Sequence, residues 1–164
     1  MKRRGKPITI LMADDNTVDC LMVKEAVEKA RLYNDLRFVE NGLDLMDYLR
    51  RRGKFNKPAD SPRPGLILLD LNMPRKDGRE ALAEIRANPQ LGDIPVVVMT
   101  ASKEDEDFWR ARNLGASIYL VKPVTFEALV NVVKSLGKYW FEILEPAPDR
   151  TEPAAAVPGG TNPG

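Results

Sequence analysis

Short apolar runs alternate with stretches of helical periodicity along most of the 164-residue chain. The runs predict five β-strands, at residues 8–13, 36–39, 65–70, 95–100 and 117–121. Four of the five are apolar at almost every position, which is typical of parallel strands covered by helices on both faces. Between the runs, apolar residues spaced three or four apart predict helices. The pattern therefore predicts strands and helices in strict alternation.

Each predicted helix has an apolar face or a capping residue that marks where it begins. Asp77, Ser102 and Thr125 stand where N-caps of the third, fourth and fifth helices belong. The expected buried faces are Val18, Leu21, Met22 and Ala26 in the first helix, Leu43, Met46 and Leu49 in the second, Ala81, Leu82 and Ile85 in the third, and Phe126, Leu129, Val130 and Val133 in the fifth.

Five strand–helix units in series predict an α/β domain over residues 7–145. Right-handed crossovers leave few topologies, and a flavodoxin-like, doubly wound (βα)5 parallel sheet with strand order 2-1-3-4-5 is the usual one at this length. In that topology, ligands bind beyond the carboxyl ends of the first and third strands. Residues 146–164 are rich in Pro, Ala and Gly without apolar periodicity, so we expect a disordered tail there.

Composition excludes several classes of function. The chain has 25 basic and 24 acidic residues, and this balance gives no sign of a nucleic-acid or membrane partner. It has no histidine and a single cysteine, Cys20, which excludes an internal disulfide, a Ser-His-Asp triad and the usual zinc sites. No apolar run approaches the roughly 20 residues of a membrane helix. We therefore expect a cytoplasmic protein.

Charged and polar residues stand at the carboxyl ends of the predicted strands. Asp14 and Asp15 follow the first strand, Asp70 ends the third, Thr100 ends the fourth and Lys122 follows the fifth. The predicted topology places these residues around one crevice. Two carboxylates about 4 Å apart repel each other by roughly 4 kcal/mol at an effective dielectric constant near 20, so the crevice calls for a cation.

Mg²⁺ suits this crevice because it prefers oxygen ligands and commonly binds one or two carboxylates together with a phosphate oxygen. Asp70 emerges from the central strand and is placed to act as a nucleophile that becomes an aspartyl phosphate. Lys122 and Thr100 are then placed to hold the phosphoryl oxygens. The residues thus predict a magnesium-dependent phosphoryl-acceptor site.

Four motifs together resemble the CheY-like receiver domain of two-component response regulators, over residues 7–141. They are LILLDLNMP with the following DG, the Asp14-Asp15 pair, Thr100-Ala101 and Lys122-Pro123. The resemblance implies that Asp70 accepts a phosphoryl group from a phosphohistidine of a sensor histidine kinase.

The resemblance also implies roles for the neighbouring residues. Asp15 would bind Mg²⁺ directly, Asp14 would support it through water, and Asn72 would offer its backbone carbonyl to the metal. Tyr119 matches the aromatic switch position, and Pro123 would follow a cis peptide bond. The residues expected to tune dephosphorylation are Asn72 and Ser102.

Two further features are similar to the single-domain response regulators that partner bacterial and cyanobacterial phytochromes. They are the long connection at residues 51–65 and the aromatic end of the last helix. The resemblance implies a phytochrome-type kinase as the partner. Large aromatic residues on the last two helices exceed what a core needs, and they predict a homodimer through the face of the fourth helix, fifth strand and fifth helix. The candidates for that interface are Phe108, Trp109, Tyr139, Trp140 and Phe141.

The function predicted is a phosphorylation switch in a signalling relay, and not an enzyme beyond its own phosphorylation and dephosphorylation. No output module follows the predicted domain, so the expected output is a protein interaction. The alternative is a small Mg²⁺-dependent phosphohydrolase with an aspartyl-phosphate intermediate. Such an enzyme needs a second acid two residues after the nucleophile, where Asn72 stands. A nucleotide-binding module is a weaker alternative, because no Gly-rich loop follows the first strand.

Overall fold

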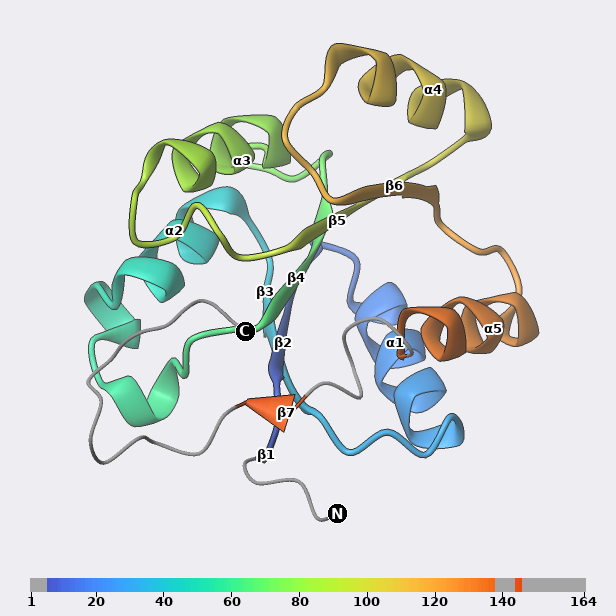
Figure 1. Ribbon diagram of the computed structural model, residues 1–164, viewed down its shortest axis with the longest axis horizontal. Helices are drawn as coiled ribbons and strands as arrows, with labels where there is room; N and C mark the ends of the chain where they lie inside the picture. The colour runs from blue at the N-terminus through green and yellow to red at the C-terminus, as the bar shows by residue number, and fades with distance from the viewer. Residues whose placement is uncertain (1–5, 138–143, 146–164) are drawn as a thin grey trace.

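A five-stranded parallel sheet forms the centre of the computed structural model, which describes residues 6–137 and 144–145 (Figure 1). The strand order is β3-β2-β4-β5-β6. The bounds are β2 Thr9–Ala13, β3 Asp35–Val39, β4 Leu66–Asp70, β5 Val96–Thr100 and β6 Ile118–Val121. This is the predicted order 2-1-3-4-5, and each predicted strand boundary agrees within one residue. The fold prediction is confirmed.

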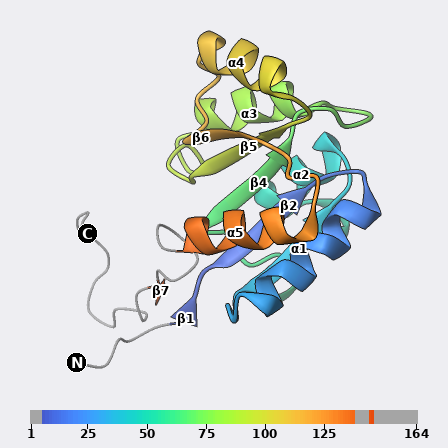
Figure 2. The ribbon, with the colours of Figure 1, turned by 90° about the vertical axis from the view of Figure 1, so that its right-hand side faces the viewer.

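Helices cover both faces of the sheet, with α1 and α5 on one face and α2 and α3 on the other (Figures 1 and 2). Helix α4 packs along the edge strand β6. The bounds are α1 Thr17–Lys29, α2 Gly42–Arg50, α3 Gly78–Ala87, α4 Lys103–Arg112 and α5 Phe126–Leu136. Two short 3-10 helices, η1 at Gly53–Phe55 and η2 at Pro58–Asp60, lie in the connection before β4.

Successive side chains of the central strands enter two separate cores. In β4, Ile67 and Leu69 pack with α2 and α3, whereas Leu66 and Leu68 pack with α1 and α5. Because strand side chains alternate between the two faces, a strand buried on both sides needs apolar residues at every position. This explains why the strands appear in the sequence as continuous apolar runs.

The predicted caps are present at three helices. The Asp77 carboxylate accepts a hydrogen bond from the Glu80 N–H, and the Glu80 side chain accepts one from the Asp77 N–H, which completes a capping box at α3. The Ser102 and Thr125 hydroxyls accept from backbone N–H groups in the first turns of α4 and α5. The starts of α3, α4 and α5 were therefore predictable from local sequence, whereas the caps of α1 and α2 are Asn16 and Asn41, which were not predicted.

The predicted buried faces of two helices are partly wrong. In α1, Val18 and Leu21 are 62% and 55% exposed. The predicted Ala26 is buried, together with Val23 and Val27, and the predicted Met22 is only partly buried. In α2, the predicted Leu43 is 38% exposed, Met46 is buried as expected, and the predicted Leu49 is only partly buried. The predicted faces of α3 and α5 are buried as expected, except that Phe126 is only partly buried. Short helices with several apolar residues allow more than one face, and packing against the sheet selects among them.

Two short strands join the ends of the described chain. The strand β1 (Lys6–Pro7) pairs antiparallel with β7 (Leu144–Glu145), apart from the main sheet. The predicted tail at 146–164 lies outside the described residues. Within the described part of the chain, none of the helices combines the length and apolar character needed to cross a bilayer.

Candidate functional site

Four strands deliver the polar residues to one edge of the sheet. Asp14 directly follows β2, Asp70 is the last residue of β4, Thr100 is the last of β5, and Lys122 directly follows β6. The parallel register pairs neighbouring strand ends closely, and Lys122 N–H donates to the Thr100 carbonyl at 2.7 Å. The predicted meeting point at the carboxyl ends is therefore formed.

Three carboxylates gather at this edge. Asp14, Asp15 and Asp70 each offer an oxygen, and these oxygens lie within 4.8 Å of one another. Asp14 is fully buried, Asp70 is 7% exposed, and Asp15 is exposed to solvent. Two buried carboxylates next to an accessible one make an oxygen-rich site with an open side, which fits a hard divalent cation that keeps some of its water.

Backbone N–H groups hold the two buried carboxylates in place. The Asn16 N–H donates to Asp14 Oδ1 at 2.9 Å, and the Asn72 N–H donates to Asp70 Oδ1 at 3.0 Å. Both bonds span two residues and tighten the chain after its strand. The second oxygen of each carboxylate is thereby aimed at the crevice, where both contact Lys122. The Asn72 side chain is exposed beside them.

Lys122 is the cation of the cluster. Its Nζ donates to Asp14 Oδ2 at 2.9 Å, Asp19 Oδ2 at 2.9 Å and Asp70 Oδ2 at 3.2 Å. An ammonium group has three donors, so all of them are used. Burial acts to lower the pKa of Lys122, but its hydrogen bonds to Asp14 and Asp19 and the charge of Asp70 outweigh burial and raise it. Burial raises the pKa of Asp14 despite the lysine.

Asp19 is a member of this cluster that the sequence analysis did not single out. It lies in the first turn of α1 and is partly exposed, and its carboxylate accepts a hydrogen bond from Lys122 Nζ. The available signal was its position four residues after Asp15, one helical turn above the acidic pair. Acidic residues are common in the first turn of a helix because they interact favourably with the helix dipole. The position of Asp19 therefore did not indicate a contact with Lys122.

A glycine lets helix α3 approach Asp70 from behind. A Cβ atom at Gly78 would lie 2.5 Å from the Asp70 carbonyl oxygen and 2.7 Å from the Leu71 Cα. The Gly78 N–H donates to the Leu71 carbonyl at 2.9 Å. Asp77 is thus confirmed as the cap of α3, and Gly78 permits the close contact.

Thr100 and Tyr119 have inward positions that the sequence did not determine. The Thr100 hydroxyl lies 3.1 Å from the Leu120 carbonyl oxygen and 3.2 Å from that of Ser102, so it donates to backbone and not to Asp70. The Tyr119 ring is already buried, and its hydroxyl accepts from the Leu114 N–H at 2.7 Å. A buried tyrosine hydroxyl requires such a partner.

The predicted cis peptide bond before Pro123 is contradicted. The described residues contain no cis peptide bond, so the bond before Pro123 is trans. The trans isomer is the one that X-Pro bonds favour, by about 0.5–1 kcal/mol, unless the surrounding chain selects the other.

The predicted dimer residues are only partly described. Phe108 is 44% exposed on α4, whereas Trp109 packs against the core between α3 and α4. Their rings meet edge to face with centroids 4.7 Å apart. Tyr139, Trp140 and Phe141 lie outside the described residues. Within the described part of the chain, Phe108 is therefore the interface candidate with an accessible ring.

A family model described as the response regulator receiver domain matches residues 10–134, which include the whole acidic cluster. The chain belongs to this family. The oxygens of Asp14, Asp15 and Asp70 are grouped closely enough to hold a metal ion.

Several relatives belong to phytochrome systems. The response regulator Rcp1 of Synechocystis is 39% identical over 136 residues, which cover 83% of this chain and 90% of Rcp1. The crystal structure of Mn²⁺-bound Rcp1 has a TM-score of 0.72 at 37% identity, covering 87% of this chain and all of the other. The phosphorylated cyanobacterial phytochrome response regulator RcpA has a TM-score of 0.71 at 36% identity, covering 82% and 94%. This receiver domain is thus related to phytochrome-associated response regulators.

Proposed function

We propose that the protein is a phosphorylation switch that accepts a phosphoryl group on Asp70 from a phosphohistidine of a sensor histidine kinase. The observation that carries the proposal is the position of Asp70 between two carboxylates and a lysine. Its Oδ2 lies 3.2 Å from Lys122 Nζ, and oxygens of Asp14 and Asp15 lie within 4.8 Å. Of these three carboxylates, that of Asp70 belongs to the last residue of a central strand, β4.

The chemistry is a phosphoryl transfer between nitrogen and oxygen. An Asp70 carboxylate oxygen forms the new bond to phosphorus, the bond between phosphorus and the histidine nitrogen breaks, and the released imidazole keeps the electron pair and takes up a proton. Lys122 then moves from carboxylate oxygens to a phosphoryl oxygen, and Thr100 gives up a backbone carbonyl to donate to another. Both residues therefore exchange contacts already present in the structure.

Asp14 and Asp15 are the residues that would hold Mg²⁺, with Asp70 and the backbone carbonyl of Asn72 as further ligands. Bound Mg²⁺ supplies charge neutralisation between the acidic residues and the incoming phosphoryl group. The fit rests on the oxygen-only donor set and on the accessible carboxylate of Asp15.

Intact-mass measurement tests the proposal. Incubation of the full chain with acetyl phosphate and Mg²⁺ is expected to add one phosphoryl group, and hydroxylamine is expected to remove it. The Asp70→Asn variant is expected to show no adduct. Asp107→Asn, which changes an exposed acid of α4, is the matched control and should label like the parent chain. A labelled Asp70→Asn chain would disprove the assignment, and continuous turnover of phosphoesters would favour the phosphohydrolase.

We further propose a phytochrome-type histidine kinase as the donor. The support is the similarity to Rcp1 and RcpA over nearly the whole of those chains. Phosphotransfer from a purified bacteriophytochrome kinase is expected to be at least about tenfold faster than from an unrelated histidine kinase, a difference of about 1.4 kcal/mol in activation free energy. Equal rates from both kinases would contradict the assignment.

The proposed output is a change of the surface formed by α4, β6 and α5, and this surface is also the proposed homodimer interface. An apolar groove lies there, lined mainly by Ile118, Leu120, Val132 and Leu136. Such a face is suited to a two-fold contact. Sedimentation of the full chain at tens of micromolar, with and without acetyl phosphate, tests this proposal. A monomer under both conditions would contradict it.

A further inference from the structure

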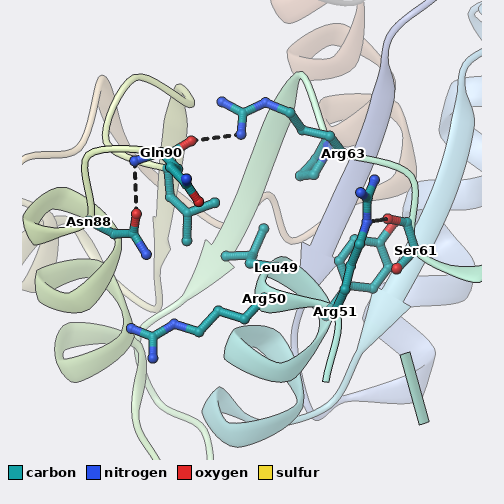
Figure 3. Close-up of a pocket in the computed structure, with 10 residues that line it drawn as sticks. Leu49, Arg50, Arg51, Ser61, Arg63, Asn88 and Gln90 are labelled. Atoms are coloured by element: carbon teal, nitrogen blue, oxygen red, sulfur yellow. Dashed lines mark hydrogen bonds between the residues drawn. The ribbon is translucent and has the colours of Figure 1, made fainter. Parts of the chain in front are cut away.

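A cavity of about 580 Å³ opens at the amino ends of the strands, the opposite end of the sheet from Asp70 (Figure 3). Three segments form its walls: the end of α2 with Arg51, the chain before β4, and the loop between α3 and β5. Its volume lies within the roughly 300–1,000 Å³ range of small-molecule sites. The receiver chemistry at Asp70 makes no use of it.

Guanidinium groups approach the cavity from different walls. Figure 3 shows Arg50, Arg51 and Arg63 around it, with Leu49 between them. Nearby acids neutralise them only in part. Asp93, an exposed residue, pairs with Arg63 at 2.9 Å. Glu84 lies 3.8 Å from Arg50 but also binds Lys76. The cavity therefore has an excess of positive charge.

Arg51 lines the cavity and makes one side-chain hydrogen bond to its wall among the described residues. Its backbone has the left-handed conformation, φ 54° and ψ 53°, which costs a residue other than glycine roughly 1–2 kcal/mol. Its Nε donates to the Ser61 carbonyl at 3.3 Å. Within the described part of the chain, its Nη1 and Nη2 have no hydrogen-bond partner. A strained residue that presents an unused pair of donors to a cavity is suited to ligand binding.

The walls around Arg51 are held rigidly. Ser61 is buried, and its hydroxyl lies 2.9 Å from the Phe55 carbonyl oxygen. The Tyr48 hydroxyl donates to the Pro62 carbonyl at 2.8 Å. On the opposite wall, Arg86 Nη1 donates to the carbonyls of Gly92 and Ile94. These bonds leave the cavity formed in the absence of a ligand, which lowers the ordering cost of binding.

We propose that this cavity binds a small organic phosphate with a planar or apolar body, of the size of a nucleoside monophosphate. The planar guanidinium fork of Arg51 matches two phosphate oxygens, and Arg63 and Arg50 add charge. Leu49, Leu91 and Pro64 offer apolar surface to the organic body. The Asn88 side-chain carbonyl accepts from the Gln90 N–H, so its amide group remains available as a donor.

Calorimetric titration of the full chain with adenosine 5′-monophosphate, in EDTA to keep metal from the acidic site, tests the proposal. We expect a submillimolar Kd, with adenosine and inorganic phosphate each at least about tenfold weaker, because each lacks one half of the recognised group. No heat of binding up to about 5 mM nucleotide, or inorganic phosphate binding as tightly as the nucleotide, would overturn the proposal.

Arg31 supplies a matched control for Arg51. Both arginines are exposed, follow the end of a helix and have positive φ values, 61° and 54°, but Arg31 does not line the cavity. Arg51→Gln is expected to weaken nucleotide binding at least about tenfold, and Arg31→Gln by less than about twofold. Equal losses in both variants would show non-specific charge attraction only and would overturn the site. Arg51→Lys keeps the positive charge but lacks the planar guanidinium group, and it should still lose most of the affinity. This second variant tests the site even if Arg51→Gln fails to fold. Phosphorylation at Asp70 is measured separately, so either proposal can fail alone.

Discussion

The two ends of the sheet have opposite charge and are built by different means. At the carboxyl end, single residues at strand tips form an acidic site around Lys122, and every donor of that lysine is engaged. At the amino end, arginines from the end of α2 and from the chain before β4 surround a cavity, and the Nη atoms of Arg51 have no hydrogen-bond partner among the described residues. Parallel strands bring their carboxyl tips together whatever the connections are, whereas the amino end depends on the length and path of each connection. The first site is therefore readable from sequence and the second is not.

The largest effect is expected from Lys122→Gln, because it leaves buried Asp14 and Asp70 without their cation. Removing one partner from a buried ion pair is costly, and we expect the free energy of unfolding to fall by about 3 kcal/mol. Urea unfolding measures it, and Mg²⁺ should restore part of the loss. Lys54→Gln, which removes the cation of an exposed pair with Asp44, should cost less than about 1 kcal/mol. Equal losses of stability in the two variants would show that the ion pairs of Lys122 contribute no more than an exposed ion pair.

A second test compares glycines at the two ends. Gly78→Ala places a methyl group 2.5 Å from the Asp70 carbonyl oxygen, so the backbone must shift, and we expect a loss of about 2 kcal/mol together with slower phosphorylation. Gly92→Ala, beside the cavity, meets its nearest atom at 3.1 Å and should cost less than about 1 kcal/mol. Chemical denaturation and acetyl phosphate labelling measure both. A Gly78→Ala chain as stable as the parent would contradict the close contact.

Smaller effects on the free energy of unfolding are expected at alkaline pH, and they differ between the two ends of the sheet. Burial raises the pKa of Cys20, near the acidic site, and of Tyr48, near the cavity, each to about 12. The unfolded thiol loses its proton near pH 9 while the folded one keeps it, so the free energy of unfolding falls as pH rises from 9 toward 12. In the parent chain, the raised thiol pKa should lower the free energy of unfolding by about 1 kcal/mol between pH 7 and pH 10, and Cys20→Ala should abolish this decrease. Tyr48→Phe should abolish a decrease less than half as large. An unchanged pH profile in Cys20→Ala would contradict the raised thiol pKa.

The smallest expected effect is that of Asp19→Asn. Asp19 competes with the incoming phosphoryl group for Lys122, and a partly exposed pair contributes about 1 kcal/mol at most. Phosphorylation by acetyl phosphate at saturating Mg²⁺ should therefore become about threefold to fivefold faster. Glu25→Gln, an exposed change on the same helix, should leave the rate unchanged. A slower Asp19→Asn chain would show that Asp19 positions Lys122 for the reaction instead of restraining it.

Much of the carboxyl-end site was open to prediction because its members carry independent signals. Asp70 ends an apolar strand, Asp14 and Asp15 follow another, and Asp77-Gly78 opens a helix. Asp19 was not predicted as a member of the site because acidic residues are common in the first turn of a helix. The exposed positions of Val18 and Leu21 escaped because periodicity marks an apolar stripe without saying which part of it meets the sheet.

The sequence by itself determined the strand order, the starts of α3, α4 and α5 and the set of residues at the strand tips, because these depend on local pattern and on the handedness of crossovers. Only the tertiary structure decided which groups each polar atom contacts. Lys122 reaches three carboxylates, Thr100 turns to backbone, Tyr119 lies inward, and the arginines meet around a cavity. Such contacts join residues distant in the chain and depend on side-chain rotamers and loop paths, which no local pattern encodes.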